Sequence, residues 1–311
     1  MINIKKYFKN LFIIFIMFCT TSSISFSVEE DSVSIDEKIA SVGFGKIFAS
    51  EPQKEITNLF KKIDYYTEKQ DLKKIREFYS DDFVNNDGFD IDTYMKSVKA
   101  GASIYCNIKI ESKINSVSVN GNYAVVHVTE NAEAETVKPT EGIDGSGLVI
   151  ASADIYYYLQ NNGRKWKIVS ANVIDENHSI LYGYAKNIYF SLNTPTQVKS
   201  NTEYTSSLTF APIKDILVSA SLASQPIVNP LPLIREPFKT VKNDGVLERI
   251  FTANTDGYNE YTIASICIAQ PQMVSQENIN FKINGAAFVI RRVNVFKPLP
   301  QKIINKKNSK G

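Results

Sequence analysis

The chain has 311 residues, of which 43% are hydrophobic and 22% are charged, so it can bury a core and is not compositionally disordered. Its 35 basic and 33 acidic side chains give a net charge of +2, which argues against nucleic acid as a partner because phosphate binding needs a basic surface. Two His and three Cys are too few for a His-rich metal site or a disulfide framework, and no metal or cofactor is expected. The length suggests about two domains.

The N-terminus has the parts of a secretory signal peptide. Three lysines, at positions 5, 6 and 9, precede the apolar run 11–18, and Ser25 and Ser27 offer a cleavage site. The apolar run is shorter than the roughly 20 residues that cross a bilayer, so no transmembrane anchor is expected. We therefore predict that residues 1–27 are removed after Ser27 and that the protein is periplasmic, cell-surface or secreted.

Removal of the leader changes the charge and the thiol count. The mature chain has 32 basic and 33 acidic side chains, a net charge of −1. Lipidation at Cys19 is the alternative to cleavage after Ser27, but the bulky Phe18 before it argues against a lipidation site. Cys106 and Cys267 remain, and we interpret them as two buried thiols.

Residues 28–51 are interpreted as a spacer, and a helical period begins at Pro52. Apolar side chains recur at the i, i+3, i+4, i+7 spacing of a helix in three segments, at 56–67, 72–79 and 91–102. Asp71 is the candidate N-cap of the second helix, and Asp90 or Asp92 that of the third.

The hydrophobic period changes to two from residue 104. Strands are predicted at 104–119, 123–137, 148–160 and 166–175. Asn120-Gly121 favours a tight hairpin between the first two strands, and residues 138–147 form a loop by composition. Three helices followed by a long, curved antiparallel sheet is an α+β arrangement.

Two groups of residues in this region have the pattern of a known superfamily. The first is the helix end Asp64-Tyr65-Tyr66 followed by the run 78–83, and the second is the late hairpin formed by 154–159 and 166–169. With these motifs, residues 52–176 resemble the NTF2-like superfamily, which includes SnoaL-like and ketosteroid-isomerase-like domains. The resemblance implies an NTF2-like cone with a hydrophobic pocket over domain 52–183, and it allows a homodimer formed through the sheet. Members include isomerases, dehydratases and pure binders, so the fold does not choose an activity.

The helical period disappears from about residue 184. Strands are predicted at 187–193, 203–210, 216–223, 246–253, 258–269 and 279–296. This spacing favours an all-β sandwich domain over 184–296, and Asp256-Gly257-Tyr258 resembles the tyrosine corner of immunoglobulin-like sandwiches. Residues 297–311, with five Lys and no acidic side chain, are predicted to be a basic disordered tail.

Asp154 is the candidate catalytic carboxylate. It lies among apolar and aromatic residues, and a carboxyl inside the cone would have a raised pKa suited to a general base. His127 completes an acid–base dyad if both side chains share a face of the sheet. The alternative interpretation places Asp154 on the solvent face and makes His127 an ordinary strand residue.

An aromatic-lined pocket is the second candidate site. Five tyrosines and one amide are expected to line it: Tyr66, Tyr79, Tyr94, Tyr156, Tyr158 and Asn172. The alternative is that the tyrosines are core packing with hydroxyls at the rim, which helical spacing explains without a ligand.

These observations favour an exported, non-catalytic binding or interaction protein of the cell envelope or extracytoplasmic space. Its expected partner is an apolar small molecule or an envelope protein. One alternative is an isomerase- or dehydratase-type enzyme that uses Asp154 for proton transfer, and another is a structural or adhesion role through the β-sandwich. The sequence has no Gly-rich phosphate loop, nucleophile elbow or His-Glu-x-x-His motif.

Overall fold

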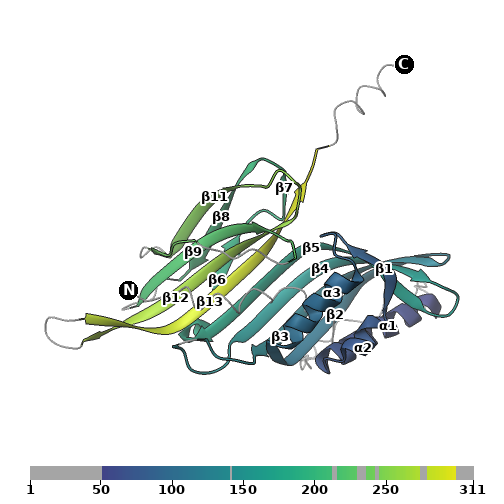
Figure 1. Cartoon of the computed structure of the whole chain (residues 1–311), viewed down its shortest axis with the longest axis horizontal. Coiled ribbons are helices and arrows are strands. Elements are labelled where there is room, and N and C mark those ends of the chain that lie inside the picture. Colours follow the sequence, from purple (N-terminus) through teal and green to yellow (C-terminus); the bar gives the residue numbers. More distant parts are fainter. Residues whose placement is uncertain are drawn as a thin grey trace, which may run out of the picture.

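The computed structural model describes residues 51–140, 142–211, 216–229, 236–241, 245–273 and 279–298. The predicted leader with Cys19, the spacer up to residue 50 and residues 299–311 of the predicted tail lie outside these ranges. Strands dominate the described residues, which form one ten-stranded sheet and one three-stranded sheet (Figure 1). Within these ranges, no helix has both the length and the apolar character needed to span a bilayer.

The helices lie near the predicted positions, with N-caps that the sequence indicates. They are α1 (Glu51–Glu68), α2 (Leu72–Arg76) and α3 (Ile91–Ala102), followed much later by the 3-10 helix η2 (Tyr184–Asn187). The carboxylate of Asp71 accepts the Lys74 N–H at 3.1 Å at the start of α2, and that of Asp90 accepts the Thr93 N–H at 2.8 Å at the start of α3.

The second helix is shorter than its apolar spacing predicts. It ends at Arg76, and Tyr79 begins strand β1 (Tyr79–Asn85) instead of extending the helix. β1 pairs in parallel with β5 (Trp166–Gly183), so pairing with the sheet overrides the helical spacing of this segment.

The large sheet places β5 at its centre. On one side lie β4 (Leu148–Asn161), β3 (Tyr123–Thr136) and β2 (Tyr105–Asn120), and on the other lie β13 (Ile279–Phe296), β12 (Glu260–Met273), β9 (Leu217–Pro226) and β10 (Lys239–Thr240). Asn120 ends β2 and pairs with Tyr123 of β3, so Gly121 and Asn122 form the turn between them, and Gly121 has a positive φ of +58°.

The sheet continues through the predicted domain boundary at 183/184. β5 runs past residue 175, where its sequence pattern was expected to end, and the added part pairs with β13 from Asn177–Arg291 to Gly183–Gly285. β13, the last strand of the described ranges, is therefore hydrogen-bonded directly to the part of the sheet that the helices cover.

The three-stranded sheet consists of β6 (Phe190–Asn193), β8 (Glu203–Phe210) and β11 (Val246–Thr252). It shares a hydrophobic core with β9, β12 and β13, in which Leu208 and Phe251 belong to the small sheet and Ile266 to the large one. The short β7 (Gln197–Lys199) pairs in parallel with β13. Tyr258 is 49% exposed, so it does not pack as the tyrosine corner that the sequence suggested.

The two faces of the large sheet differ in the region of β2–β5. The helices cover one face, which we call the inner face (Figure 1). Val126 and Val128 of β3 and Ile155 and Tyr157 of β4 pack there with Phe60 of α1. Residues between these along each strand point to the opposite, outer face, because side chains alternate across a strand.

Gly183, where β5 meets β13, is expected to tolerate no side chain. Its φ is +53°, and an added Cβ would collide with the backbone oxygen of Asn284 and lie 2.7 Å from the Ile143 side chain. We expect Gly183→Ala to lower the free energy of unfolding by about 3 kcal/mol in urea denaturation. Gly163→Ala is the matched control, since Gly163 has φ +83° with open space around it. It should cost only about 1 kcal/mol, and equal losses would contradict the steric explanation.

Candidate functional site

The predicted Asp154–His127 dyad is formed, but on the outer face. His127 Nε2 lies 2.8 Å from Asp154 Oδ1, and the Thr129 hydroxyl donates to the same oxygen at 3.3 Å. The His127 ring stacks on the Tyr156 ring with centroids 4.5 Å apart. The side chains of His127 and Asp154 are 24% and 37% exposed.

This placement corrects the interpretation of Asp154 as a pocket base. Its neighbours Ala153 and Ile155 are buried on the inner face, so strand alternation directs Asp154 away from the interior. Asp154 is half-exposed on the outer face, so the solvent-face alternative describes the observed geometry.

The tyrosines predicted to line one pocket divide between the two faces. Tyr79 and Tyr94 are buried inside with their hydroxyls 3.1 Å apart, and Tyr66 packs at the edge of the same core. Tyr156, Tyr158 and Asn172 lie on the outer face instead, so these three residues do not line the interior. Side chains alternate between the two faces along a strand. Tyr157 occupies the inward position, so Tyr156 and Tyr158 on either side of it point outward.

The interior contains two acidic side chains that the sequence analysis did not single out. Asp64 of α1 is 4% exposed and Glu130 of β3 is 1% exposed. The Tyr157 hydroxyl donates to Glu130 Oε1 at 2.8 Å. The Oδ1 atom of Asp64 and the Oε2 atom of Glu130 are shielded from solvent and have no hydrogen-bond partner among the residues that the structure describes.

Burial shifts both acids toward the protonated form. Desolvation raises the pKa of Asp64 to about 10, and the neighbouring charge of Glu130 adds to this rise. Desolvation also raises the pKa of Glu130 to about 8, against the hydrogen bond from Tyr157 and with a further rise caused by the charge of Glu176. Both pKa values lie above 7, so burial favours the protonated form of each carboxyl at neutral pH.

Positional signals for both acids are present in the sequence. Asp64 follows Phe60 by one helical turn, on the inward stripe of α1. Glu130 follows Val126 and Val128 at the inward period of β3. A carboxylate at an inward position is rarely buried without a partner or a function. Helical spacing identifies Asp64 as inward and strand alternation identifies Glu130 as inward, so both acids could have been selected as candidates from the sequence.

A second polar cluster lies beside the acids, on the part of β5 that extends past residue 175. His178 Nε2 lies 3.0 Å from Glu176 Oε1, and both side chains are almost fully buried. Glu176 is next to Ala153, and His178 is next to Ala151, so small side chains separate this cluster from β3. His178 lies beyond residue 175, where the predicted strand ends, and the longer observed strand places it in the interior.

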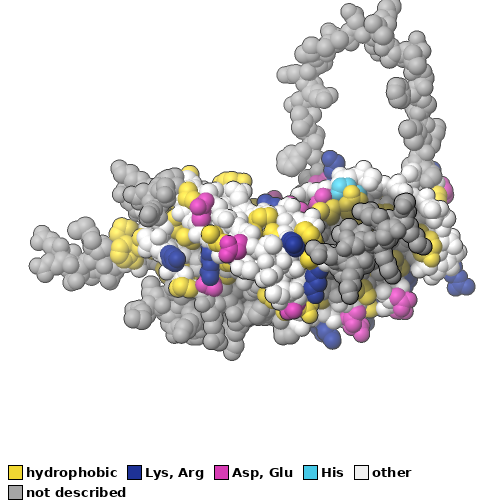
Figure 2. All heavy atoms as spheres, turned by 90° about the horizontal axis from the view of Figure 1, so that it is seen from above, with side chains coloured by type: hydrophobic (Ala, Val, Ile, Leu, Met, Phe, Trp, Pro, Cys, Tyr) yellow, Lys and Arg dark blue, Asp and Glu magenta, His cyan; other side chains and the backbone are white. Residues whose placement is uncertain are grey.

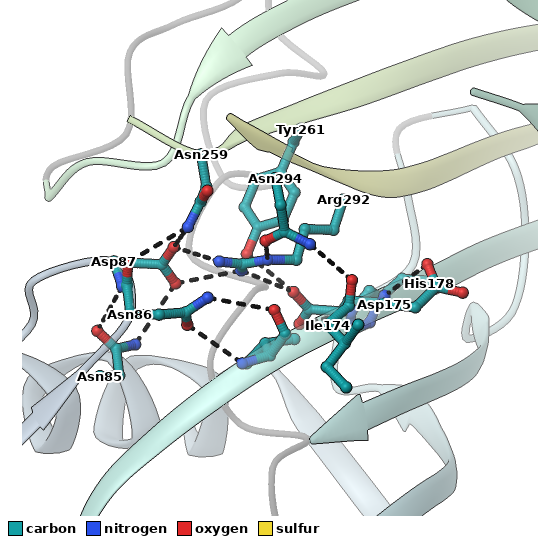
Figure 3. A network of polar contacts seen from close by, with 12 residues as sticks. Asn85, Asn86, Asp87, Ile174, Asp175, His178, Asn259, Tyr261, Arg292 and Asn294 are labelled. Carbon is teal, nitrogen blue, oxygen red and sulfur yellow. Dashed lines mark hydrogen bonds and ion pairs between the residues drawn. The ribbon is translucent and has the colours of Figure 1, made fainter. Parts of the chain in front are cut away.

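The C-terminal strands complete this cluster. Tyr261 of β12 donates to Glu176 Oε2 at 3.2 Å, and Arg292 Nη1 of β13 lies 3.5 Å from the same oxygen. Arg292 also binds Asp87, in the loop between β1 and α3 (Figure 3). Segments far apart in the sequence thus meet in one buried polar network.

The viewed surface has no such concentration of charge. Figure 2 shows the Lys and Arg side chains of that face scattered among Asp, Glu and apolar side chains. Among the described residues, no group of three or more His, Cys, Asp and Glu side chains is placed to hold a metal ion. Cys106 and Cys267 are both free thiols.

Comparison with known proteins gives structural neighbours only. No protein-family model matches the chain, and no curated protein matches it. A candidate scytalone dehydratase from Novosphingobium aromaticivorans matches with 12% identity and a TM-score of 0.35 over 39% of this chain and 82% of its own. A hexachlorocyclohexane dehydrochlorinase of type 2 matches with 11% identity and a TM-score of 0.33 over 39% and 83%.

A third structure is a candidate dehydratase of the NTF2-like family from Streptomyces avermitilis, with 16% identity and a TM-score of 0.28 over 39% of this chain and 95% of its own. The last of these three is described as NTF2-like, the superfamily whose pattern the sequence of residues 52–176 has. Each match is partial and covers well under half of the chain.

Proposed function

We propose that the protein is an exported binding protein that holds a small, largely apolar molecule between α1 and the inner face of the sheet. The observation that carries the proposal is the pair of unpartnered oxygens on Asp64 and Glu130. A buried polar atom without a partner costs about 1–3 kcal/mol, and a hydroxyl or carbonyl group of a ligand would supply one. Phe60 and Tyr157, whose rings lie 5.2 Å apart, provide apolar contacts nearby. Because both oxygens are shielded from solvent, a ligand enters as α1 moves away from the sheet.

A thermal-shift screen of small cyclic alcohols and ketones tests this function. Compounds that raise the melting temperature of the mature protein are then tested on Glu130→Gln and Asp64→Asn. We expect both substitutions to reduce the shift strongly, because each removes a carboxyl that contacts the ligand. Asp154→Asn is the matched control on the outer face and should leave the shift unchanged. Loss of the shift in Asp154→Asn alone would move the binding site to the outer face.

Proton transfer is the second candidate function, and the protonation of Glu130 is the specific observation in its favour. Burial holds its pKa at about 8, close enough to neutrality for the group to give up and recover a proton. An isomerase- or dehydratase-type reaction would then use Glu130 where the sequence suggested Asp154. A rate that depends on pH around 8, disappears in Glu130→Gln and persists in Asp154→Asn would support catalysis. Ligand binding without turnover at any pH would support the non-catalytic function.

Export is proposed from the leader alone. The basic, apolar and small-residue parts of residues 1–27 predict a mature chain that begins at Val28. The intact mass of the protein recovered outside the cytoplasm should equal that of residues 28–311. A retained leader, or a lipid-modified Cys19, would contradict the predicted cleavage.

A further inference from the structure

A row of buried side chains crosses the inner face from the helix-covered strands to the C-terminal strands. Glu130 pairs in register with Ala153, Ala153 with Glu176, and Tyr261 with Arg292. The contact between Glu176 Oε2 and Arg292 Nη1 joins the two parts of the row. At the usual strand spacing of about 4.8 Å, the backbones of Glu130 and Glu176 lie roughly 10 Å apart with the small Ala153 between them.

Arg292 is held in one orientation by its other contacts. Its side chain is 1% exposed, and both of its terminal nitrogens bind the carboxylate of Asp87, with Nη1 to Oδ2 at 3.1 Å. Its Nε donates to Asn294 Oδ1 at 2.8 Å. Figure 3 shows the guanidinium between Asp87 and the β5 residues. A planar guanidinium fixed on these sides keeps Nη1 directed at Glu176.

Glu176 in turn is the polar group of β5 nearest in register to Glu130. His178 and Tyr261 contact its two oxygens at 3.0 and 3.2 Å, so its carboxylate is fixed from three sides when Arg292 is included. The titratable groups that act on Glu130 are Tyr157 from β4 and Glu176 from β5, and the charge of Glu130 acts in turn on Asp64 from α1.

We propose that Arg292 is a positioning residue for the interior site: by fixing and neutralising Glu176, it sets how readily Glu130 releases its proton. The inference rests on the proposed function, because Glu130 is one of the two acids of that site. It makes the C-terminal strands part of the site, although they lie outside the region that resembles NTF2-like proteins.

The test is the titration of the Glu130 carboxyl in the full mature chain, followed by carbon-13 NMR and assigned with Glu130→Gln. Arg292 lies one strand beyond Glu176, so at the usual strand spacing its positive charge is roughly 14 Å from Glu130. Removing that charge should raise the Glu130 midpoint by about one pH unit in Arg292→Gln. Arg292→Lys keeps the positive charge, so its Glu130 midpoint should match the wild type, while the protein remains less stable than the wild type. A merely structural role of Arg292 would not separate the midpoint from the stability in this way.

Arg291→Gln is the matched control. Arg291 is the adjacent residue of β13, but it forms its ion pair with Asp175 at 2.9 Å on the outer side, and its loss should leave the Glu130 midpoint unchanged. Equal shifts in Arg291→Gln and Arg292→Gln would overturn the proposal.

Glu176→Gln keeps the proposal testable if Arg292→Gln does not fold. Removing the Glu176 charge should lower the Glu130 midpoint, and an unchanged midpoint overturns the role of Arg292, which acts through Glu176. A wild-type Glu130 midpoint near the ordinary 4.5 overturns the interior site itself. A raised midpoint that no Arg292 variant moves overturns only the positioning role.

Discussion

Replacing Glu130 with glutamine is expected to stabilise the protein at pH 8 and to reduce the dependence of its unfolding free energy on pH. Burial raises the pKa of Glu130 from 4.5 to about 8, so the folded chain keeps a proton that the unfolded chain has released. The stability that this proton provides is complete below pH 4.5 and is lost as the pH rises to about 8, at about 1.4 kcal/mol per pH unit. Asp64, whose pKa rises from 3.8 to about 10, contributes with the same sign.

The expected net gain of Glu130→Gln at pH 8 is about 2–3 kcal/mol. Glutamine keeps the oxygen that accepts the Tyr157 hydroxyl, but its amide nitrogen replaces an unpartnered oxygen and costs about 1–2 kcal/mol. Urea denaturation at several pH values between 5 and 9 measures the effect through the fluorescence of Trp166, the only tryptophan.

Asp154→Asn is the control for this prediction, since it removes a half-exposed carboxylate and should keep the wild-type slope. Parallel pH profiles for the wild type and Glu130→Gln would show that Glu130 is ionised in the folded protein. That outcome would falsify the assignment of a proton to Glu130.

Loss of Arg292 is expected to destabilise both halves of the large sheet together. Arg292→Met leaves the carboxylates of Asp87 and Glu176 buried without their cation, which typically costs about 3–5 kcal/mol. Trp166 lies at the opposite end of β5 from the pairing with β13 and should report the full loss in urea denaturation.

Arg291→Met provides the comparison on the same strand. Its partner Asp175 is 40% exposed, so the loss should stay within about 1 kcal/mol. A Trp166 transition that Arg292→Met leaves unchanged would mean that the helix-covered part unfolds independently of β13.

Sequence patterns located the strands well but not the faces on which their side chains lie. The period of two gave β3 and β4 nearly to the residue, since an alternating strand between turn residues has few other readings. Both faces of β4 carry aromatic residues, so Tyr156 and Tyr157 are equally plausible inward positions until the burial of Ile155 decides the parity. For this reason the sequence could pair Asp154 with His127 but could not decide between the interior and the solvent face, and the structure has them on the outer face.

The interior site contains residues that the sequence could identify and others whose burial depends on contacts between distant segments. Asp64 and Glu130 each occupy an inward position that period and phase identify, so a search for acids on apolar stripes would have found them. The end of β5 was harder to predict, because Glu176 and His178 are polar and their burial depends on β12 and β13. No local pattern encodes a partner that lies more than a hundred residues away, as Arg292 does from Glu176.

The pairing of β13 with β5 has a consequence for how the protein is made. Residues 184–278 separate two strands that lie side by side in the finished sheet. During synthesis from the N- to the C-terminus, β5 emerges long before the strand that covers its edge. An uncovered edge next to Ile180 and Tyr182 is a template for pairing with another chain. A chain synthesised in this order needs that edge shielded until β13 has been made. Chains truncated before residue 279 are therefore expected to aggregate.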